Sequence, residues 1–198
     1  MSLISTKEDD VGADDLRLQT LRARISWICQ ILRFGAPIAV VWGFIDDIVL
    51  FSDATKLSKQ VAFLFGENFV PPIADWQRLA LFASTLPCRL ALFALAYNAW
   101  LLFSGYLAGR IFTIDAARLL QSCGVFGAIG VILDILTRPL VVPILAGTRS
   151  AGAHPAVPEL PFFGPVDLHY LIFYVALVGL GHIQKTAAEI YAENAQIV

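Results

Sequence analysis

Four long apolar stretches constrain this chain more than any other feature. They lie at about residues 34–51, 79–103, 119–140 and 168–183. Most are close to the roughly 20 apolar residues that an α-helix needs to cross a hydrocarbon core about 30 Å thick. Charged residues make up only 15% of the chain, against roughly 25% in a typical soluble domain. The sequence therefore predicts an all-α, polytopic membrane four-helix bundle, with no room for a separate soluble catalytic domain.

The two ends of the chain are polar. Residues 1–13 carry charges without apolar periodicity and are predicted to be a disordered cytoplasmic tail, ahead of a single membrane domain at 14–198. A helix can begin at Asp14, and an apolar stripe follows at Leu18, Leu21, Ile25, Ile28 and Leu32. This segment is either an amphipathic helix at the lipid interface or an extension of the first span. A short cytoplasmic helix is predicted at 184–196.

The segments between the spans are predicted to be loops. Residues 52–77 contain the apolar run 61–65, which is too short to cross a membrane and is expected to dip into the interface. Trp76 is interpreted as an interfacial anchor. Residues 146–165 are rich in Gly and Pro and are expected to form a loop.

The third span carries signals for its start and its packing. Thr113 or Asp115 is expected to cap its N-terminus. Within the span, glycines recur every three residues, and small residues let helices approach closely in lipid. The predicted packing face consists of Gly124, Gly127 and Gly130.

Basic residues near the span ends predict the orientation. With the N-terminus in the cytoplasm, the inside holds Arg17, Arg22, Arg24, Arg33, Arg110, Arg118 and Lys185. The outside then holds Lys56, Lys59, Arg78 and Arg149. The excess of Lys and Arg on one side favours both termini in the cytoplasm.

Charged residues inside the apolar stretches are the most informative candidates for function. A charge at mid-membrane costs at least about 2.5–3.5 kcal/mol, so such residues normally pair or face a wet cavity. Arg89 is placed to pair with one of two aspartates of the first span, and Asp134 shares a helix face with Arg138. The interpretations are a polar pocket for a small ligand, ion or proton, or a structural ion-pair network, which the near balance of the two signs favours. The cluster consists of Asp46, Asp47, Arg89, Asp134 and Arg138.

No cofactor, metal or catalytic centre is predicted. His169 and His182 lie near opposite ends of one predicted helix, so they cannot both serve one haem, and His154 lies in a loop. A nucleophile with a base at suitable spacing is not evident, which disfavours an enzyme. The net charge of −2 gives no reason to expect direct nucleic-acid binding. The cysteines, interpreted as small buried hydrophobes, are Cys29, Cys88 and Cys123.

Two stretches of the sequence resemble a known family. The first is Gly109-Arg-Ile-Phe-Thr113, followed by Ala117, Leu120 and Gly124; the second is the acidic C-terminal segment from Lys185 to Val198. Both are similar to motifs of a bacterial family of small four-span membrane proteins catalogued as domain of unknown function 2975. This chain departs from that pattern at Gln121-Ser-Cys123, where the family tends to be basic, and in a longer last loop.

The resemblance implies four helices, a location in the bacterial inner membrane and no established activity. Some relatives are encoded beside small helix-turn-helix regulators, which makes such a soluble regulator a candidate partner besides the lipid bilayer. The first hypothesis is therefore a membrane-embedded interaction or sensor component. It would dock partners through a cytoplasmic face comprising Arg110, Phe112, Ile190 and Tyr191.

The alternative hypothesis is a small-ligand or ion binder, or a transporter subunit, that uses the intramembrane charge cluster. A chain of 198 residues is small for a transporter, so this alternative also predicts a homodimer. An enzyme acting on lipid is the least favoured hypothesis.

Overall fold

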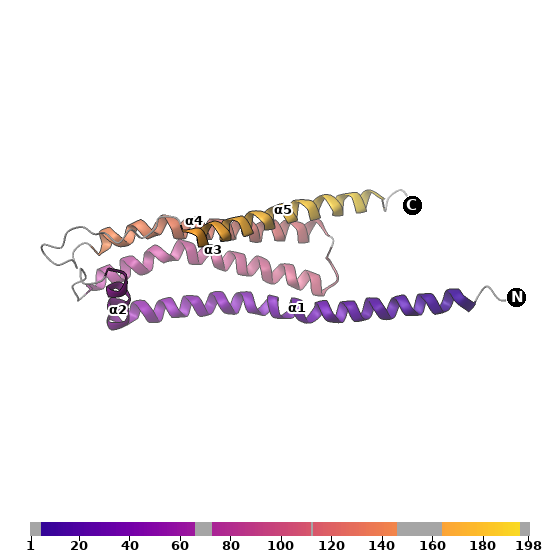
Figure 1. Ribbon diagram of the computed structural model, residues 1–198, viewed down its shortest axis with the longest axis horizontal. Coiled ribbons are helices and arrows are strands. Elements are labelled where there is room, and N and C mark those ends of the chain that lie inside the picture. The colour runs from indigo at the N-terminus through magenta and orange to yellow at the C-terminus, as the bar shows by residue number, and fades with distance from the viewer. Residues whose placement is uncertain (1–4, 66–72, 112, 146–163, 195–198) are drawn as a thin grey trace.

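The computed structural model describes the backbone of residues 5–65, 73–111, 113–145 and 164–194, and the side chains within these ranges except those of 5–25, 63–65, 191 and 194. This part of the chain is entirely helical. Its elements are α1 (Ser5–Ser52), α2 (Ala54–Phe65), α3 (Asp75–Leu107), α4 (Ile114–Ile144) and α5 (Pro165–Asn194). The four long helices run lengthwise, and the short α2 crosses them at one end (Figure 1).

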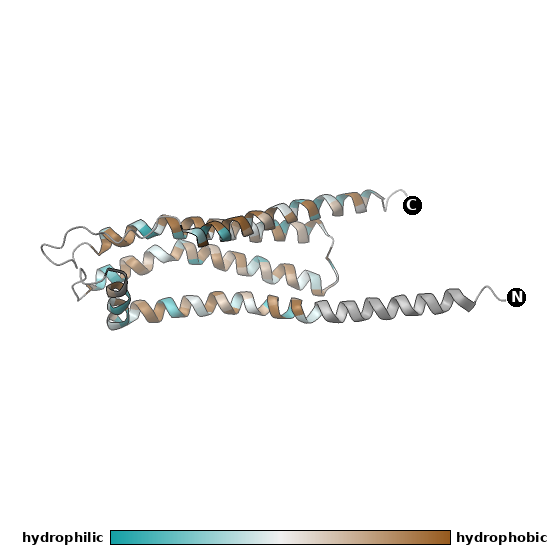
Figure 2. Cartoon of the chain, in the orientation of Figure 1, coloured by the Kyte–Doolittle hydropathy of each residue, from teal (hydrophilic) through white to brown (hydrophobic). Residues whose placement is uncertain are grey.

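Four helices are long and apolar enough to cross a membrane: Ser26–Ser52, Asp75–Leu107, Ile114–Ile144 and Pro165–Ile190. The prediction of an all-α chain with four long apolar helices is confirmed. Each helix is longer than its apolar stretch, because backbone hydrogen bonding continues after the side chains become polar. The 33 residues of α3 span about 50 Å at about 1.5 Å per residue, which exceeds a hydrocarbon core of about 30 Å. Apolar residues dominate the shared length of the helices (Figure 2).

The long helices pack in an open row. Helix α1 packs on α3, α3 packs on α4, and α4 packs on α5. The two outer helices, α1 and α5, have no comparable contact with each other. Among the described residues the arrangement is therefore less closed than the predicted bundle, and each outer helix has a single long neighbour.

Two glycines of the predicted packing face set the close approach of α4 to α5. A Cβ built on Gly124 would lie 2.7 Å from the carbonyl oxygen of Tyr174 and 2.9 Å from the backbone nitrogen of Val178. The position of a Gly127 Cβ is occupied by the ring of Tyr174. Gly130 instead faces Leu92 of α3. The close approach predicted for this face thus holds for Gly124 and Gly127 toward α5, whereas a Cβ on Gly130 would make only ordinary contact with α3.

The predicted loop at 52–77 is partly wrong, because residues 54–65 form α2. Asp53 begins this helix: its carboxylate accepts hydrogen bonds from the backbone N–H groups of Thr55 and Lys56, at 2.9 and 3.2 Å. These bonds lower the pKa of Asp53 below its usual value. Leu57 and Val61, one turn apart, are buried in an apolar cluster with residues of α3 and α4. Leu57 and Val61 therefore belong to the buried side of a helix that packs across the end of the row.

The predicted helices near both chain ends are continuous with the first and last long apolar helices. Helix α1 begins at Ser5, earlier than the predicted start at Asp14, and has no break before the first span. Acidic residues near a helix N-terminus favour such an extension, because they complement the helix dipole. Helix α5 likewise runs on to Asn194 in place of a separate C-terminal helix. The division into a tail and one membrane domain stays a prediction.

The turn between α3 and α4 follows its sequence signals. Gly109, with φ of +78°, takes the left-handed conformation that ends α3. The Thr113 hydroxyl accepts a hydrogen bond from the Ala116 N–H at 3.2 Å, so Thr113 is the cap of α4. Gln184 of α5 donates to the Ile111 carbonyl at 2.5 Å and ties the turn to the last helix. The predicted loop at 146–165 lies outside the described residues apart from Gly164 and Pro165, which begins α5.

Replacement of Gly124 by alanine tests the close contact of α4 and α5. We expect Gly124→Ala to lower the free energy of unfolding by about 1–3 kcal/mol, because the added methyl group meets backbone atoms that cannot move independently. The measurement is thermal unfolding of the purified protein in detergent. Gly179→Ala is the control, since its Cβ would have no atom within 4 Å. Equal behaviour of the two variants would contradict this account of the packing.

Candidate functional site

An ion pair links α1 and α3. Arg89 of α3 donates from Nε to Oδ2 of Asp47 at 2.5 Å and from Nη2 to Oδ1 at 2.8 Å. The two side chains are 26% and 15% exposed. A Cβ on Gly43 would lie 3.3 Å from Arg89 Nη1, so this glycine leaves room for the guanidinium against α1. The two parallel hydrogen bonds fix the guanidinium in one orientation.

A second ion-pair group links α4 and α5. Arg138 donates to Oδ2 of Asp134 one turn earlier on α4, and it binds both carboxylate oxygens of Asp167, with all three distances at 2.7 Å. The Asp167 carboxylate also accepts the N–H of Gly164 at 2.8 Å. The side chain of Asp167 is only 9% exposed, while that of Asp134 is 51% exposed. Asp167 is therefore satisfied by its partners, whereas Asp134 remains accessible.

Both groups border one cavity of about 390 Å³ between α3, α4 and α5. Its floor is α4, because α3 and α5 pack on α4 and have no comparable contact with each other. Gly130 and Leu92 form part of the apolar wall, and Cys88 also lines the cavity. The polar lining includes Arg89, Asp134, Arg138, Asp167, Tyr170 and Tyr174.

The charges around this cavity do not cancel. The network of Asp47, Arg89, Asp134, Arg138 and Asp167 has two positive and three negative groups, a formal sum of −1. The Oδ1 atom of Asp134 accepts no hydrogen bond from the described residues, and Arg89 Nη1 likewise donates none. The cavity therefore offers a carboxylate oxygen and guanidinium N–H groups to a bound molecule.

The structure brings together four of the five residues of the predicted cluster. Asp47 is the partner of Arg89, and Asp134 is paired with Arg138 on the same helix. Asp46 is exposed, and no ion pair joins it to a described residue. The sequence prediction misses Asp167, because it begins the last apolar stretch at residue 168. The sequence does contain a signal for it: Asp167 is an acidic residue at the edge of that stretch, and it is expected at about the same level as Arg138.

The candidate docking face is described only in part. Arg110 is exposed in the turn after α3, and Ile190 is 53% exposed near the end of α5. Phe112 and the side chain of Tyr191 lie outside the described residues. Because Gln184 is bonded to the turn, Arg110 and Ile190 belong to the same end of the molecule.

The histidines and cysteines lie in different surroundings. His169 forms a 2.5 Å hydrogen bond with the Pro165 carbonyl, and His182 is exposed on the same helix. Cys29 and Cys123 are buried, whereas Cys88 is partly exposed in the cavity. Among the described residues, no three His, Cys, Asp or Glu side chains gather closely enough to hold a metal ion.

Removal of Arg89 tests the first ion pair. We expect Arg89→Gln to lower the free energy of unfolding by about 3 kcal/mol, because Asp47 keeps its charge without a partner. Asp47→Asn combined with Arg89→Gln removes both charges and is expected to cost less than Arg89→Gln alone. Chemical unfolding of the wild type and the two variants in detergent measures the difference. A double variant less stable than Arg89→Gln would contradict the assigned pairing.

In comparisons with known proteins, no family model, no curated protein and no solved structure matches this chain. The resemblance to the domain of unknown function 2975 family stays a prediction from the two sequence motifs. The function must be argued from the chain's own residues.

Proposed function

We propose that this chain is a four-span membrane protein that binds a small polar ligand or ion in the cavity between α3, α4 and α5. The observation that supports the proposal is the ion-pair network bordering a cavity of about 390 Å³. Charged groups that only held helices together would need no such space beside them. We place this hypothesis ahead of the docking hypothesis because Arg89, Asp134 and Arg138 of the predicted cluster all line the cavity.

Membrane insertion is part of the proposal. Large apolar side chains are exposed along the outer helices, among them Trp42 at 73% and Val175 at 64%. A soluble chain rarely leaves so much contiguous apolar surface in water, whereas lipid tails cover it without cost. The start of α1, the α3–α4 turn and the end of α5 lie at one end of the molecule (Figure 1). We place this end in the cytoplasm of a bacterium, with the chain in the inner membrane.

The charge of the network indicates the class of ligand. A single unbalanced charge in a low-dielectric layer is costly. One monovalent cation, or an amine with one positive charge, would bring the formal sum from −1 to zero. Asp134 is the acceptor in this proposal, because it has a free carboxylate oxygen and is half exposed. The rings of Tyr170 and Tyr174 border the same cavity and provide faces for cation–π contact.

Cys88 provides a native probe of the cavity. In a Cys29→Ala, Cys123→Ala background, we expect aminoethyl methanethiosulfonate to label Cys88 roughly tenfold faster than the anionic sulfonatoethyl reagent, because the excess carboxylate concentrates cations. Labelling is measured by mass spectrometry of the intact chain in membrane vesicles.

Two variants make this test specific. Asp134→Asn should abolish the preference for the cationic reagent, because it removes the unbalanced charge. Glu189→Gln is the matched control, since this carboxylate pairs with Lys185 far along α5 and does not line the cavity. Cys88 that does not react at all, or a preference that survives in Asp134→Asn, would overturn the proposal.

Docking of a partner is the second candidate function. Its supporting observation is that the Gln184–Ile111 hydrogen bond holds the α3–α4 turn against α5, which brings the exposed Arg110 and Ile190 to the same end of the molecule. Arginine and large apolar side chains are common anchors in protein interfaces. The proposed partners are a soluble helix-turn-helix regulator or a second copy of this chain, for which the open row leaves α1 and α5 available.

Charge reversal tests the docking face. We expect Arg110→Glu combined with Ile190→Glu to remove any protein that crosslinks to the chain in native membranes, as read by mass spectrometry after affinity purification. Both side chains are exposed, so the variant should keep its thermal stability. Glu193→Gln, exposed near the same end, is the control. An unchanged set of crosslinked proteins would contradict this candidate function.

A further inference from the structure

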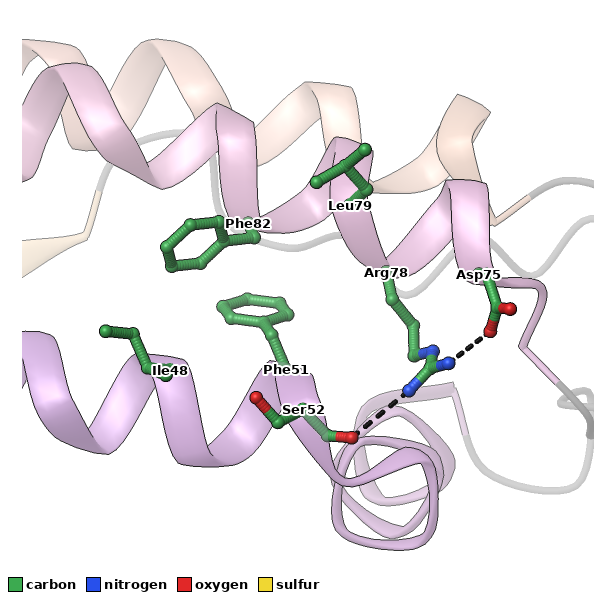
Figure 3. Close-up of a pocket in the computed structure, with 7 residues that line it drawn as sticks. All are labelled: Ile48, Phe51, Ser52, Asp75, Arg78, Leu79 and Phe82. Carbon is green, nitrogen blue, oxygen red and sulfur yellow. Dashed lines mark hydrogen bonds and ion pairs between the residues drawn. The ribbon is translucent and has the colours of Figure 1, made fainter.

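A second cavity, separate from the charged one, lies at the opposite end of the molecule from the two termini. It has a volume of about 400 Å³ and lies between the last turns of α1 and the first turns of α3. Figure 3 shows its walls: Ile48 and Phe51 come from α1, and Leu79 and Phe82 come from α3. The two phenylalanine rings meet edge to face with centroids 5.7 Å apart. The cavity is therefore apolar along most of its length.

One guanidinium group marks the polar end of this cavity. Arg78 donates from Nη1 to the carbonyl oxygen of Ser52 at 3.2 Å and forms an ion pair with Asp75 (Figure 3). Its Nε is buried and has no hydrogen-bond partner among the described residues. The Asp75 side chain is 92% exposed, so solvent weakens this ion pair. An anion that reached Arg78 would compete mainly with an exposed carboxylate.

The surroundings of Arg78 match the headgroup level of a membrane. Trp76, two residues earlier, is 62% exposed, as is typical of interfacial anchors. Helix α2 crosses the end of the row here with its apolar side buried, and Lys56 and Lys59 are exposed on its other side. Basic residues of an amphipathic helix attract anionic lipid headgroups.

We propose that this cavity binds an anionic glycerophospholipid, with the phosphate at Arg78 and part of one acyl chain along the apolar wall that Phe51, Leu79 and Phe82 form. The apolar walls distinguish a lipid from free phosphate, because a free phosphate would leave the apolar length unfilled and lose its hydration against it. The site shares no residue with the charged cavity.

Native mass spectrometry of the full chain in detergent tests the proposal. The probes are dioleoylphosphatidylglycerol and dioleoylphosphatidylcholine, which have the same acyl chains and differ in headgroup charge. We expect preferential retention of the anionic lipid, and roughly fivefold weaker binding in Arg78→Gln, the effect of losing one basic residue at an anionic lipid. Asp75→Asn should bind more tightly than the wild type, because it removes the competing carboxylate.

The matched control is Arg118→Gln. Arg118 also follows an aspartate by three residues at the start of a helix, Asp115, but it lies on α4 outside this cavity. Equal retention of the two lipids, unchanged binding in both Arg78→Gln and Asp75→Asn, or an equal loss in Arg118→Gln would overturn the proposal. Displacement of the anionic lipid by millimolar inorganic phosphate would assign the site to free phosphate instead. If Arg78→Gln fails to fold, the tighter lipid binding expected of Asp75→Asn still tests the proposal.

Discussion

Pairing of arginine with aspartate is the constraint on which the arrangement of these helices depends. A guanidinium stays charged at any physiological pH, so among apolar helices it must be matched by a carboxylate on a neighbour. Arg89 joins α3 to α1, and Arg138 joins α4 to α5. Each pair uses two parallel hydrogen bonds to its interhelical partner, which fixes the relative height and rotation of the helices more narrowly than apolar contact does.

The packing of α4 on its two neighbours depends on the shape of its surface as well as on these ion pairs. Helix α4 approaches α5 closely through Gly124 and Gly127, and Gly130 faces α3 at ordinary contact distance. Close approach increases dispersion contact, which matters most where no hydrophobic effect drives apolar helices together. Because α4 holds both neighbours, α3 and α5 remain apart, and the space left over α4 is the charged cavity. The cavity is thus a consequence of the open row.

The two cavities differ in depth and in chemistry. The one between α3, α4 and α5 is bordered by both arginine groups and has an excess carboxylate, which suits a small cation. The one between α1 and α3 has apolar walls and a single arginine at the end of the row, which suits a lipid. The first would serve the proposed function, and the second would anchor the chain to one leaflet.

The sequence alone determined that the chain forms four long apolar helices, because length and hydropathy are local properties that need no knowledge of neighbours. It also indicated a cap at Thr113 or Asp115, the glycine face of α4 and the pairing of Asp134 with Arg138 on one helix, which follow from spacing within one helix. The tertiary structure decided which aspartate pairs with Arg89, brought Asp167 to Arg138 and left Asp46 exposed. It also made α2 a helix, because its amphipathic pattern becomes stable only when Leu57 and Val61 are buried against α3 and α4. Contacts between residues far apart in the chain depend on how the helices rotate and approach one another. The periodicity of a single sequence does not give the rotation of one helix relative to another or the distance between them.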